Sequence, residues 1–235
     1  MNDSAQLVQN NWNRVQEVVQ AAADESQWKQ EVQVVGVSKY VDAPQTNLLV
    51  QAGCHELGEN RPQVLWEKFD WFAQEQPTQP QWHMIGHLQR NKVRRTLPML
   101  KMIHSVDSLR LAKTLEDEAA KIERQVSILA EVNVTQDDSK TGMPERQLSP
   151  FLEQIADMPN LELRGLMAMS THFAGGDQAR AEFARVRDLR DRLQTSFPQF
   201  DLRELSMGMS GDFREAILEG ATLVRIGSSL WEGIR

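Results

Sequence analysis

The chain alternates short apolar segments with longer amphipathic ones, and this alternation limits its fold more than any other feature. Eight runs of strand-like composition occur along the 235 residues. They are VQVVGVS (32–38), CHELGEN (54–60), WHMIGH (82–87), KMIHSVD (101–107), SILAEVNV (127–134), LELRGLMAMS (161–170), RELSMGMS (203–210) and TLVRIGSSL (222–230). Strands that alternate with helices pair in parallel through right-handed crossovers. Eight such units predict a closed (β/α)8 barrel, with an open doubly wound sheet as the alternative if one unit is misassigned.

Amphipathic segments lie between these runs and ahead of the first one. Residues 108–124, 144–158 and 177–197 have apolar positions three and four apart, the spacing of a helix with one buried face. The same spacing over residues 7–22 predicts an extra N-terminal helix. No repeat and no domain-sized linker interrupts the pattern, so we expect a single barrel domain over residues 1–235.

Composition narrows the class of protein. The formal net charge of -7 argues against general nucleic-acid binding, although QRNKVRR (89–95) leaves that alternative open beside a solvated helix face. Cys54 is the only cysteine, which excludes an internal disulfide, and we expect it to be a small buried apolar side chain. There is no signal-peptide pattern and no apolar run of about 18 residues, so we expect a cytoplasmic protein.

Two loops are candidates for holding an anion. In barrels of this kind, phosphate is commonly bound by the loops after the seventh and eighth strands. Here these loops read SMGMSGDF, in which Ser210 or Asp212 would cap a short helix, and RIGSS, which contains Gly227. Gly208 and Gly211 allow the backbone to approach a ligand closely. Free N–H groups and serine hydroxyls are what a phosphate needs, whereas capping and turn formation are the structural alternative.

Two basic residues lie at strands that are neighbours in a closed barrel. Arg225 lies inside the apolar stretch LVRIG of the eighth strand, so it needs either a salt-bridge partner or a ligand. Lys39 ends the first strand. A free lysine is almost entirely protonated at pH 7, and burial with nearby positive charge would favour its neutral form. A neutral amine that faces a phosphate site is suited to a Schiff base with a phosphorylated aldehyde.

These motifs together resemble a known family. GVSKY, LGEN, WHMIGHLQRNK, DDSKTGM, RGLMAMS, LSMGMSGDFREAI and TLVRIGSS, in order from residue 32 to 230, are similar to the pyridoxal phosphate homeostasis protein family. That family resembles the N-terminal barrel of alanine racemase standing alone. The resemblance implies that pyridoxal 5'-phosphate (PLP) is bound through a Schiff base to Lys39, with Arg225 near the pyridine nitrogen. It further implies phosphate contacts from Ser210, Gly227 and Ser228, and a pocket lined by Asn60, His83 and Ser206.

The chain departs from the family pattern in two places. It ends SSLWEGIR, where members usually have an aromatic residue followed by glycine soon after the last strand, and Arg61 stands where many have tyrosine. The first departure concerns the C-terminal contacts and the second the pocket rim.

A PLP-dependent racemase is the alternative function. An arginine at the pyridine nitrogen leaves that nitrogen unprotonated and weakens the ring as an electron sink. Racemisation also needs a second base on the opposite face of the substrate. The only tyrosine, Tyr40, follows Lys39 and is expected to point to the other side of the strand. We therefore predict a PLP carrier or buffer without racemase activity. We expect it to be a monomer with apo PLP-dependent enzymes as partners.

Two smaller hypotheses remain. His83 and His87 could be metal ligands, but their spacing includes Gly86 and no HExxH glutamate accompanies them, so no metal is expected. Lys140 in DDSKTGM follows the fifth strand and is a candidate secondary contact for an anion or aldehyde. His55, His104 and His172 have no assigned role and are expected to be hydrogen-bonded barrel histidines.

Overall fold

Eight parallel strands close into a barrel. The computed structural model describes residues 3–76, 78–135, 141–171 and 176–234. The barrel strands are β1 (Gln33–Val37), β2 (Glu56–Glu59), β3 (Gln81–Met84), β4 (Leu100–Val106), β5 (Val126–Asn133), β7 (Leu161–Met167), β8 (Glu204–Met209) and β9 (Leu223–Ile226). They pair in the order β4-β3-β2-β1-β9-β8-β7-β5, and a further β4–β5 pairing closes the ring. The predicted (β/α)8 barrel is confirmed, and the open-sheet alternative is wrong.

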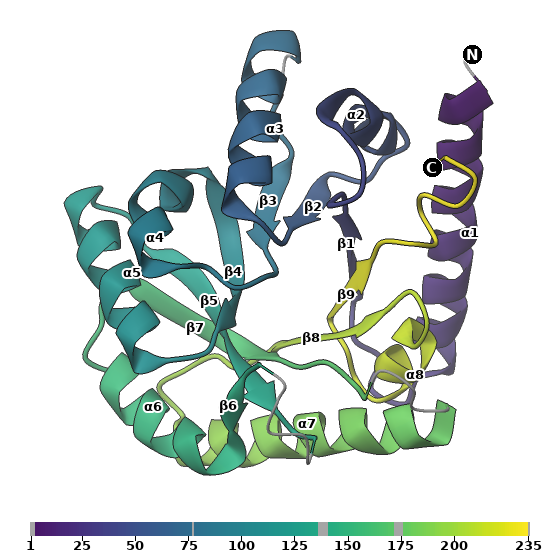
Figure 1. Ribbon diagram of the computed structural model, residues 1–235. Coiled ribbons are helices and arrows are strands. Elements are labelled where there is room, and N and C mark those ends of the chain that lie inside the picture. The colour runs from purple at the N-terminus through teal and green to yellow at the C-terminus, as the bar shows by residue number, and fades with distance from the viewer. Residues whose placement is uncertain (1–2, 77, 136–140, 172–175, 235) are drawn as a thin grey trace.

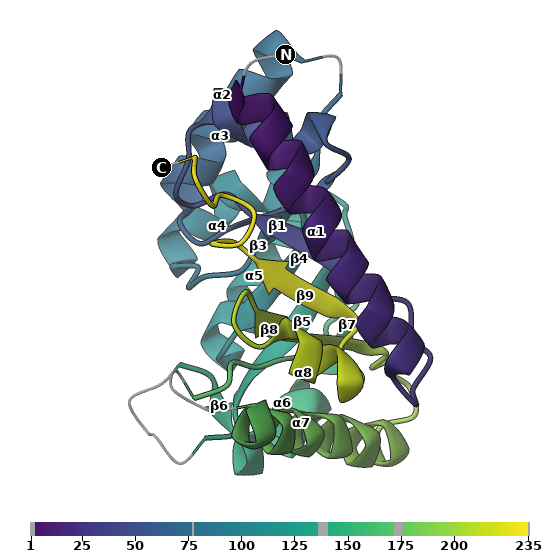
Figure 2. The same ribbon diagram turned by 90° about the vertical axis from the view of Figure 1, so that its right-hand side faces the viewer.

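Helices cover the outside of the barrel (Figure 1). They are α1 (Asp3–Glu25), α2 (Ala43–Gln51), α3 (Pro62–Glu75), α4 (Arg90–Thr96), α5 (Leu109–Lys121), α6 (Leu148–Ile155), α7 (Gly176–Ser196) and α8 (Phe213–Leu218). The extra helix α1 is present as predicted and runs past β9 and the C-terminal segment (Figure 2). Asn11 of α1 donates hydrogen bonds to the carbonyls of Leu230 and Glu232, which fixes that segment against the helix.

The segment after β5 differs from the prediction. A helix was expected over 144–158, but Met143–Pro144 forms a short strand, β6, that pairs with Val132 and Asn133 of β5. A 3-10 turn over 145–147 follows, and α6 begins only at Leu148. Proline at 144 has the extended backbone angles φ -57 and ψ 147, which a helix does not accept.

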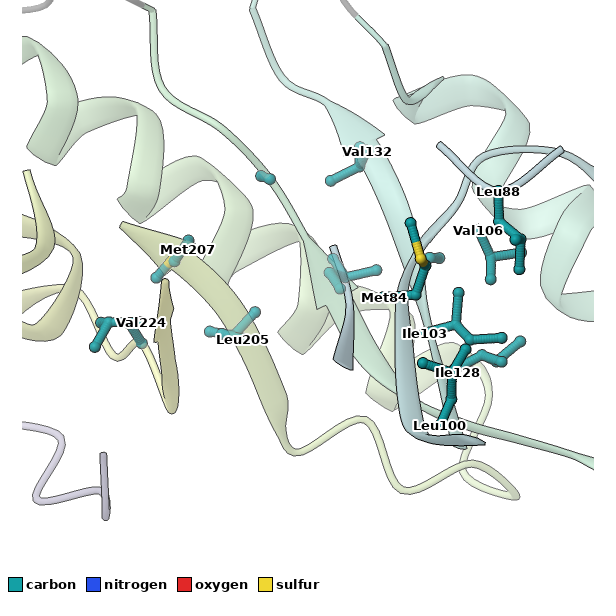
Figure 3. Close-up of a cluster of buried hydrophobic side chains, with 14 of the residues drawn as sticks. Met84, Leu88, Leu100, Ile103, Val106, Ile128, Val132, Leu205, Met207 and Val224 are labelled. Carbon is teal, nitrogen blue, oxygen red and sulfur yellow. The ribbon is translucent and has the colours of Figure 1, made fainter. Parts of the chain in front are cut away.

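The strands have two buried faces. Side chains that point outward pack against the helices in one large apolar core, part of which is drawn in Figure 3, where Ile103, Ile128 and Val224 are labelled. Side chains that point inward form a second, smaller apolar cluster, made of Val35, Met102, Leu129, Met167 and Leu223. Because successive strand residues alternate between faces, Leu223 and Arg225 share the inner face of β9, whereas Val224 faces the helices.

The structure places the cysteine and the basic segment that the sequence singled out. Cys54 is buried, and burial raises the pKa of its thiol to about 12, which suits an apolar packing role. The basic segment forms α4, in which Arg94 and Arg95 are exposed and Arg95 and Lys92 lie over the ring of Trp66. Across the described residues, no helix combines the length and apolarity needed to cross a membrane.

Candidate functional site

A cavity of about 650 Å³ opens at the carboxyl ends of the barrel strands. In barrels of this type, that end is where ligands bind. The residues that line the cavity come from β1, β2, β3, β5, β7, β8 and β9 or from the turns that follow them. They include Lys39, Asn60, Glu131, Ser210, Arg225, Gly227 and Ser228. Six of the eight residues predicted for cofactor binding therefore share one cavity, namely Lys39, Asn60, Ser210, Arg225, Gly227 and Ser228.

The turns after β8 and β9 are tied together by one serine. The Ser210 hydroxyl oxygen accepts hydrogen bonds from the backbone N–H of Gly227 at 3.1 Å and of Ser229 at 3.4 Å. The expectation of free N–H groups is wrong for these two, because the serine already occupies them. Two N–H groups that converge on one oxygen are nevertheless a donor pattern that suits a phosphate oxygen.

Gly208 and Asp212 have structural roles beside this pair of turns. Gly208 has φ +91, and a Cβ there would lie 2.6 Å from the Cβ of Ala216 in α8, so its close approach is to a helix and not to the cavity. Asp212 is the N-cap residue of α8, but its side chain makes no cap hydrogen bond, and neither does Ser210. Asp212 instead accepts from the backbone N–H of Met209 and from the hydroxyl of Ser170.

Arg225 is buried and faces the cavity. It donates through Nη1 to the carbonyl oxygen of Ser206 at 2.6 Å and to its hydroxyl at 2.7 Å, and through Nη2 to the carbonyl oxygen of Ala168 at 3.1 Å. Among the described residues, no carboxylate lies within 4.0 Å of its guanidinium nitrogens, so this part of the chain shows no interior salt bridge to Arg225. Burial lowers the pKa of Arg225 to about 10, so it is still a cation at neutral pH.

Lys39 lies at the rim and is exposed. The expectation that burial surrounds this amine is wrong, because β1 ends at Val37 and Lys39 and Tyr40 lie exposed in the turn that follows it. Tyr40 was expected to point away from Lys39, but alternation holds only inside a strand. Both residues line the cavity, with Lys39 Nζ 4.7 Å from the centre of the Tyr40 ring.

The backbone below Lys39 is held by buried polar groups. Lys68 of α3 donates to the Ser38 carbonyl oxygen at 2.7 Å and to Glu59 Oε1 at 2.5 Å, and the Ser38 hydroxyl donates to the same Glu59 oxygen. The second carboxylate oxygen of Glu59 is the buried side-chain atom without a hydrogen-bond partner in the described part of the chain. Burial also lowers the pKa of Lys68, and Glu59 opposes that effect.

The atypical C-terminal segment supports the same turn. Trp231 is buried and donates through Nε1 to the carbonyl oxygen of Val37 at 2.8 Å. Val37 is the last residue of β1, two positions before Lys39. The departure from the family ending thus has a structural role next to the proposed lysine. Arg61, the other departure, is exposed at the start of α3.

His83 and Ser206 do not line the cavity, which corrects the expectation for these two residues. Both are buried inside the barrel. Ser206 accepts from Arg225 and contacts the ring of His104, and His83 contacts His104 and Glu56. Both side chains form hydrogen bonds with other interior groups in the layer beneath the cavity.

Sequence reasoning missed Glu131. This residue of β5 lines the cavity, is only 4% exposed, and accepts a hydrogen bond from the Thr141 hydroxyl at 2.5 Å. Burial raises the pKa of Glu131, and Thr141 and Arg225 oppose that effect. Its place on the inner face of the fifth barrel strand was the signal that could have identified it.

The structure bears on the hypothesis of a metal site at His83 and His87, but not on the hypothesis for Lys140. His83 is buried with Glu56 and His104, whereas His87 is exposed and lies 3.3 Å from Asp107, and the described residues contain no cluster of three or more metal-ligating groups. Lys140 and His172 lie outside the described residues. The hypothesis for Lys140 therefore stays a prediction.

Fold and site together define a barrel of the alanine racemase N-terminal type. The family model described as "Alanine racemase, N-terminal domain" matches residues 4–233. The chain is 34% identical over 220 residues to the pyridoxal phosphate homeostasis protein of Aquifex aeolicus, covering 93% of this chain and 95% of the relative. It is 32% identical over 239 residues to the protein of the same name from Escherichia coli K12, covering 98% and 97%.

The fold also matches a solved structure of similar sequence. PipY of Synechococcus elongatus, solved with PLP bound, superposes with a TM-score of 0.85 at 31% identity, over 95% of this chain and 99% of PipY. The chain belongs to the pyridoxal phosphate homeostasis protein family.

Proposed function

We propose that this protein binds PLP reversibly through Lys39 and acts in PLP homeostasis, by buffering the cofactor or delivering it. The observation that carries the proposal is the convergence of Lys39, Arg225 and the Ser210–Gly227 pair of turns on one cavity. The PLP bound to PipY and the names of the relatives support it.

The residues of the cavity fit the chemical groups of this cofactor. PLP supplies an aldehyde that condenses reversibly with a primary amine. Lys39 would provide that amine from the rim, where exposure lets it reach both solvent and cavity. The turns after β8 and β9, with Ser210, Gly227 and Ser228, would hold the phosphate. Arg225 would donate to the pyridine nitrogen, and Asn60 would contact the ring from the β2 side.

A PLP-dependent racemase is the second candidate function, and Glu131 is the observation that favours it. A carboxyl group buried on the cavity wall is a candidate acid or base. Tyr40 is a weaker candidate, because it contacts Lys39 on the same part of the rim. We favour a carrier because Arg225 would keep the pyridine nitrogen unprotonated and so weaken the electron sink.

Other parts of the proposal depend on the same role. We propose that the whole chain, residues 1–235, acts as one PLP-binding domain without racemase activity. That it is a cytoplasmic monomer, and that apo PLP-dependent enzymes receive its cofactor, are predictions that follow from a carrier function.

The test is a PLP titration followed by absorbance. Wild-type protein should turn yellow and lose the colour on prolonged dialysis, and Lys39→Ala should stay colourless. Lys113→Ala, which removes an exposed lysine of α5, is the matched control and should behave as wild type. Colour in Lys39→Ala equal to that of wild type would refute the assignment. Solvent deuterium at Cα of D- or L-alanine, lost in Glu131→Gln, would support the racemase instead.

A further inference from the structure

A continuous line of hydrogen bonds crosses the barrel interior beneath the cavity. It begins at Arg225, whose Nη1 lies 2.7 Å from the Ser206 hydroxyl oxygen. That oxygen lies 2.8 Å from Nδ1 of His104, and Nε2 of His104 lies 2.7 Å from Nδ1 of His83. Nε2 of His83 lies 2.7 Å from Oε2 of Glu56. The line thus joins a cavity residue of β9 to the first residue of β2, at the opposite end of the barrel.

The chemistry of the two ends sets the direction of every hydrogen bond between them. A guanidinium can only donate, and an ionised carboxylate can only accept. Ser206 accepts from Arg225, so its own hydrogen is available for Nδ1 of His104. His104 then donates from Nε2 to Nδ1 of His83, and His83 donates from Nε2 to Glu56. Each imidazole uses one nitrogen as acceptor and the other as donor, which is the capacity of a neutral ring.

The electrostatics of the three titratable groups agree with this direction. Burial holds the pKa of His104 well below its usual range, and His83 and Arg225 act in the same sense. Burial also lowers the pKa of His83, although Glu56 opposes it. Burial alone would raise the pKa of Glu56, but hydrogen bonds from His83 and Lys101 outweigh it and keep the group a carboxylate.

Among the described residues, no carboxylate pairs directly with Arg225, and the charges of Asp212 and Glu131 stabilise its cation from a distance. What the line of hydrogen bonds adds is a fixed rotamer for Arg225. A guanidinium has five N–H donors. Three are used by Ser206 and Ala168, and the other two have no acceptor in the described part of the chain.

We infer that Ser206, His104 and His83 are positioning residues for Arg225, linked to Glu56 as a one-way hydrogen-bond chain in which both histidines are Nε2–H tautomers. The expected effect on PLP affinity rests on the proposed function, whereas the hydrogen-bond chain does not. A purely space-filling role for these side chains would require no particular tautomer and no effect of Glu56 on His104, since no hydrogen bond joins these two residues directly in the described part of the chain.

The first test needs neither a variant nor the cofactor. Nitrogen-15 NMR of histidine-labelled apo protein at pH 7 distinguishes the two neutral tautomers and the cation. We expect the Nε2–H pattern for both buried rings. An Nδ1–H pattern or a doubly protonated ring at either position would overturn the inference, because the line would then run in the other direction or be broken.

The second test asks whether the loss of Glu56 affects His104 through the hydrogen-bond chain. Glu56→Ala removes its acceptor, and Glu162→Ala is the matched control, a glutamate at the same end of the barrel that accepts from Ser127 of β5 instead. Glu56→Ala should shift the ring nitrogen signals of His104, which it does not touch, and weaken PLP binding roughly tenfold, the size of one hydrogen bond to a charged group. Glu162→Ala should do neither.

The possible results distinguish a failure of the hydrogen-bond chain from a failure of the proposed function. Unchanged His104 signals in Glu56→Ala would contradict the hydrogen-bond chain, as would equal effects of the two variants. Shifted signals with no change in PLP affinity would overturn the positioning role. Absence of PLP binding by the wild type would refute the proposed function, whereas the tautomers would still test the chain. If Glu56→Ala fails to fold, the wild-type tautomers keep the inference testable.

Discussion

The two sides of the cavity differ in how far their binding groups are fixed. On the β8–β9 side, Arg225 is buried with three hydrogen bonds, and Ser210 joins the two turns. On the β1–β2 side, Lys39 is exposed, and only the backbone beneath it is anchored, through Ser38 and Val37.

This difference matches two different tasks. Groups that recognise a phosphate and a ring bind best when they are already in place, because no ordering cost remains at the moment of binding. A lysine that must form and release a covalent bond needs access to water, since hydrolysis of the imine consumes a water molecule. An anchored backbone with an exposed side chain therefore suits reversible capture.

The largest effect on stability is expected from the buried ion pair below Lys39. Lys68→Met leaves the Glu59 carboxylate buried without its cation, and removal of one partner of such a pair costs about 3–5 kcal/mol. Urea denaturation of the variant should show this loss in the free energy of unfolding. The double variant Lys68→Met with Glu59→Leu should recover most of it. A loss below about 1 kcal/mol would mean that this side is not anchored as described.

On the β8–β9 side, the largest expected effect is a loss of PLP affinity. Arg225→Met removes the cation but keeps an apolar side chain of similar length, so PLP affinity should fall by about 1.5–3 kcal/mol, roughly 10- to 150-fold. Isothermal titration of PLP measures the change. Arg94→Met, which alters an exposed arginine of α4, is the control. Equal affinities for all three proteins would remove Arg225 from the site.

The buried histidines predict a dependence of stability on pH. Burial lowers the pKa of both His83 and His104, so both resist protonation in the folded protein when the unfolded chain, with a histidine pKa of about 6.5, takes up protons. The unfolded state then binds more protons, and stability is lost as pH falls. A histidine that stays neutral throughout contributes about 1.4 kcal/mol of loss between pH 7.5 and about 5.5. We expect that loss for His104, whose pKa lies well below its usual range, and at most that loss for His83.

A difference measurement isolates this effect. Glu131, whose pKa is raised, acts in the opposite direction but is common to the wild type and His104→Phe. The loss of stability between the two pH values should be smaller in His104→Phe by about 1.4 kcal/mol. Thermal or urea unfolding at both values provides the numbers, and identical losses would contradict the depressed pKa of His104.

The smallest effect is expected at the serine that joins the two turns. Ser210→Ala leaves the N–H groups of Gly227 and Ser229 without their acceptor, and a typical hydrogen bond contributes about 1 kcal/mol. Stability and PLP affinity should both fall by about that amount. Ser229→Ala keeps the backbone donors and Ser210 and should change neither quantity. An equal loss in both variants would indicate a general effect of the turn.

The fold and the anion side of the site followed from local patterns. Alternating strands and helices predicted the barrel, and glycine with hydroxyl residues after the last two strands predicted the turns that carry Ser210 and Gly227. The rest depends on positions that only the folded chain brings together. His83 and His104 become neighbours through the β3–β4 register, in which His83 is paired with Met102. Tyr40 was misplaced because the strand ended three residues earlier than an alternation argument requires.

Chemical trapping of bound PLP identifies the lysine that forms the covalent bond. Borohydride reduction of the protein with bound PLP makes the linkage permanent, and peptide mass spectrometry then identifies the lysine. We expect one phosphopyridoxyl group per chain, on the peptide that contains Lys39. Modification that falls mainly on any other lysine, or protein that remains unmodified at saturating PLP, would contradict this expectation.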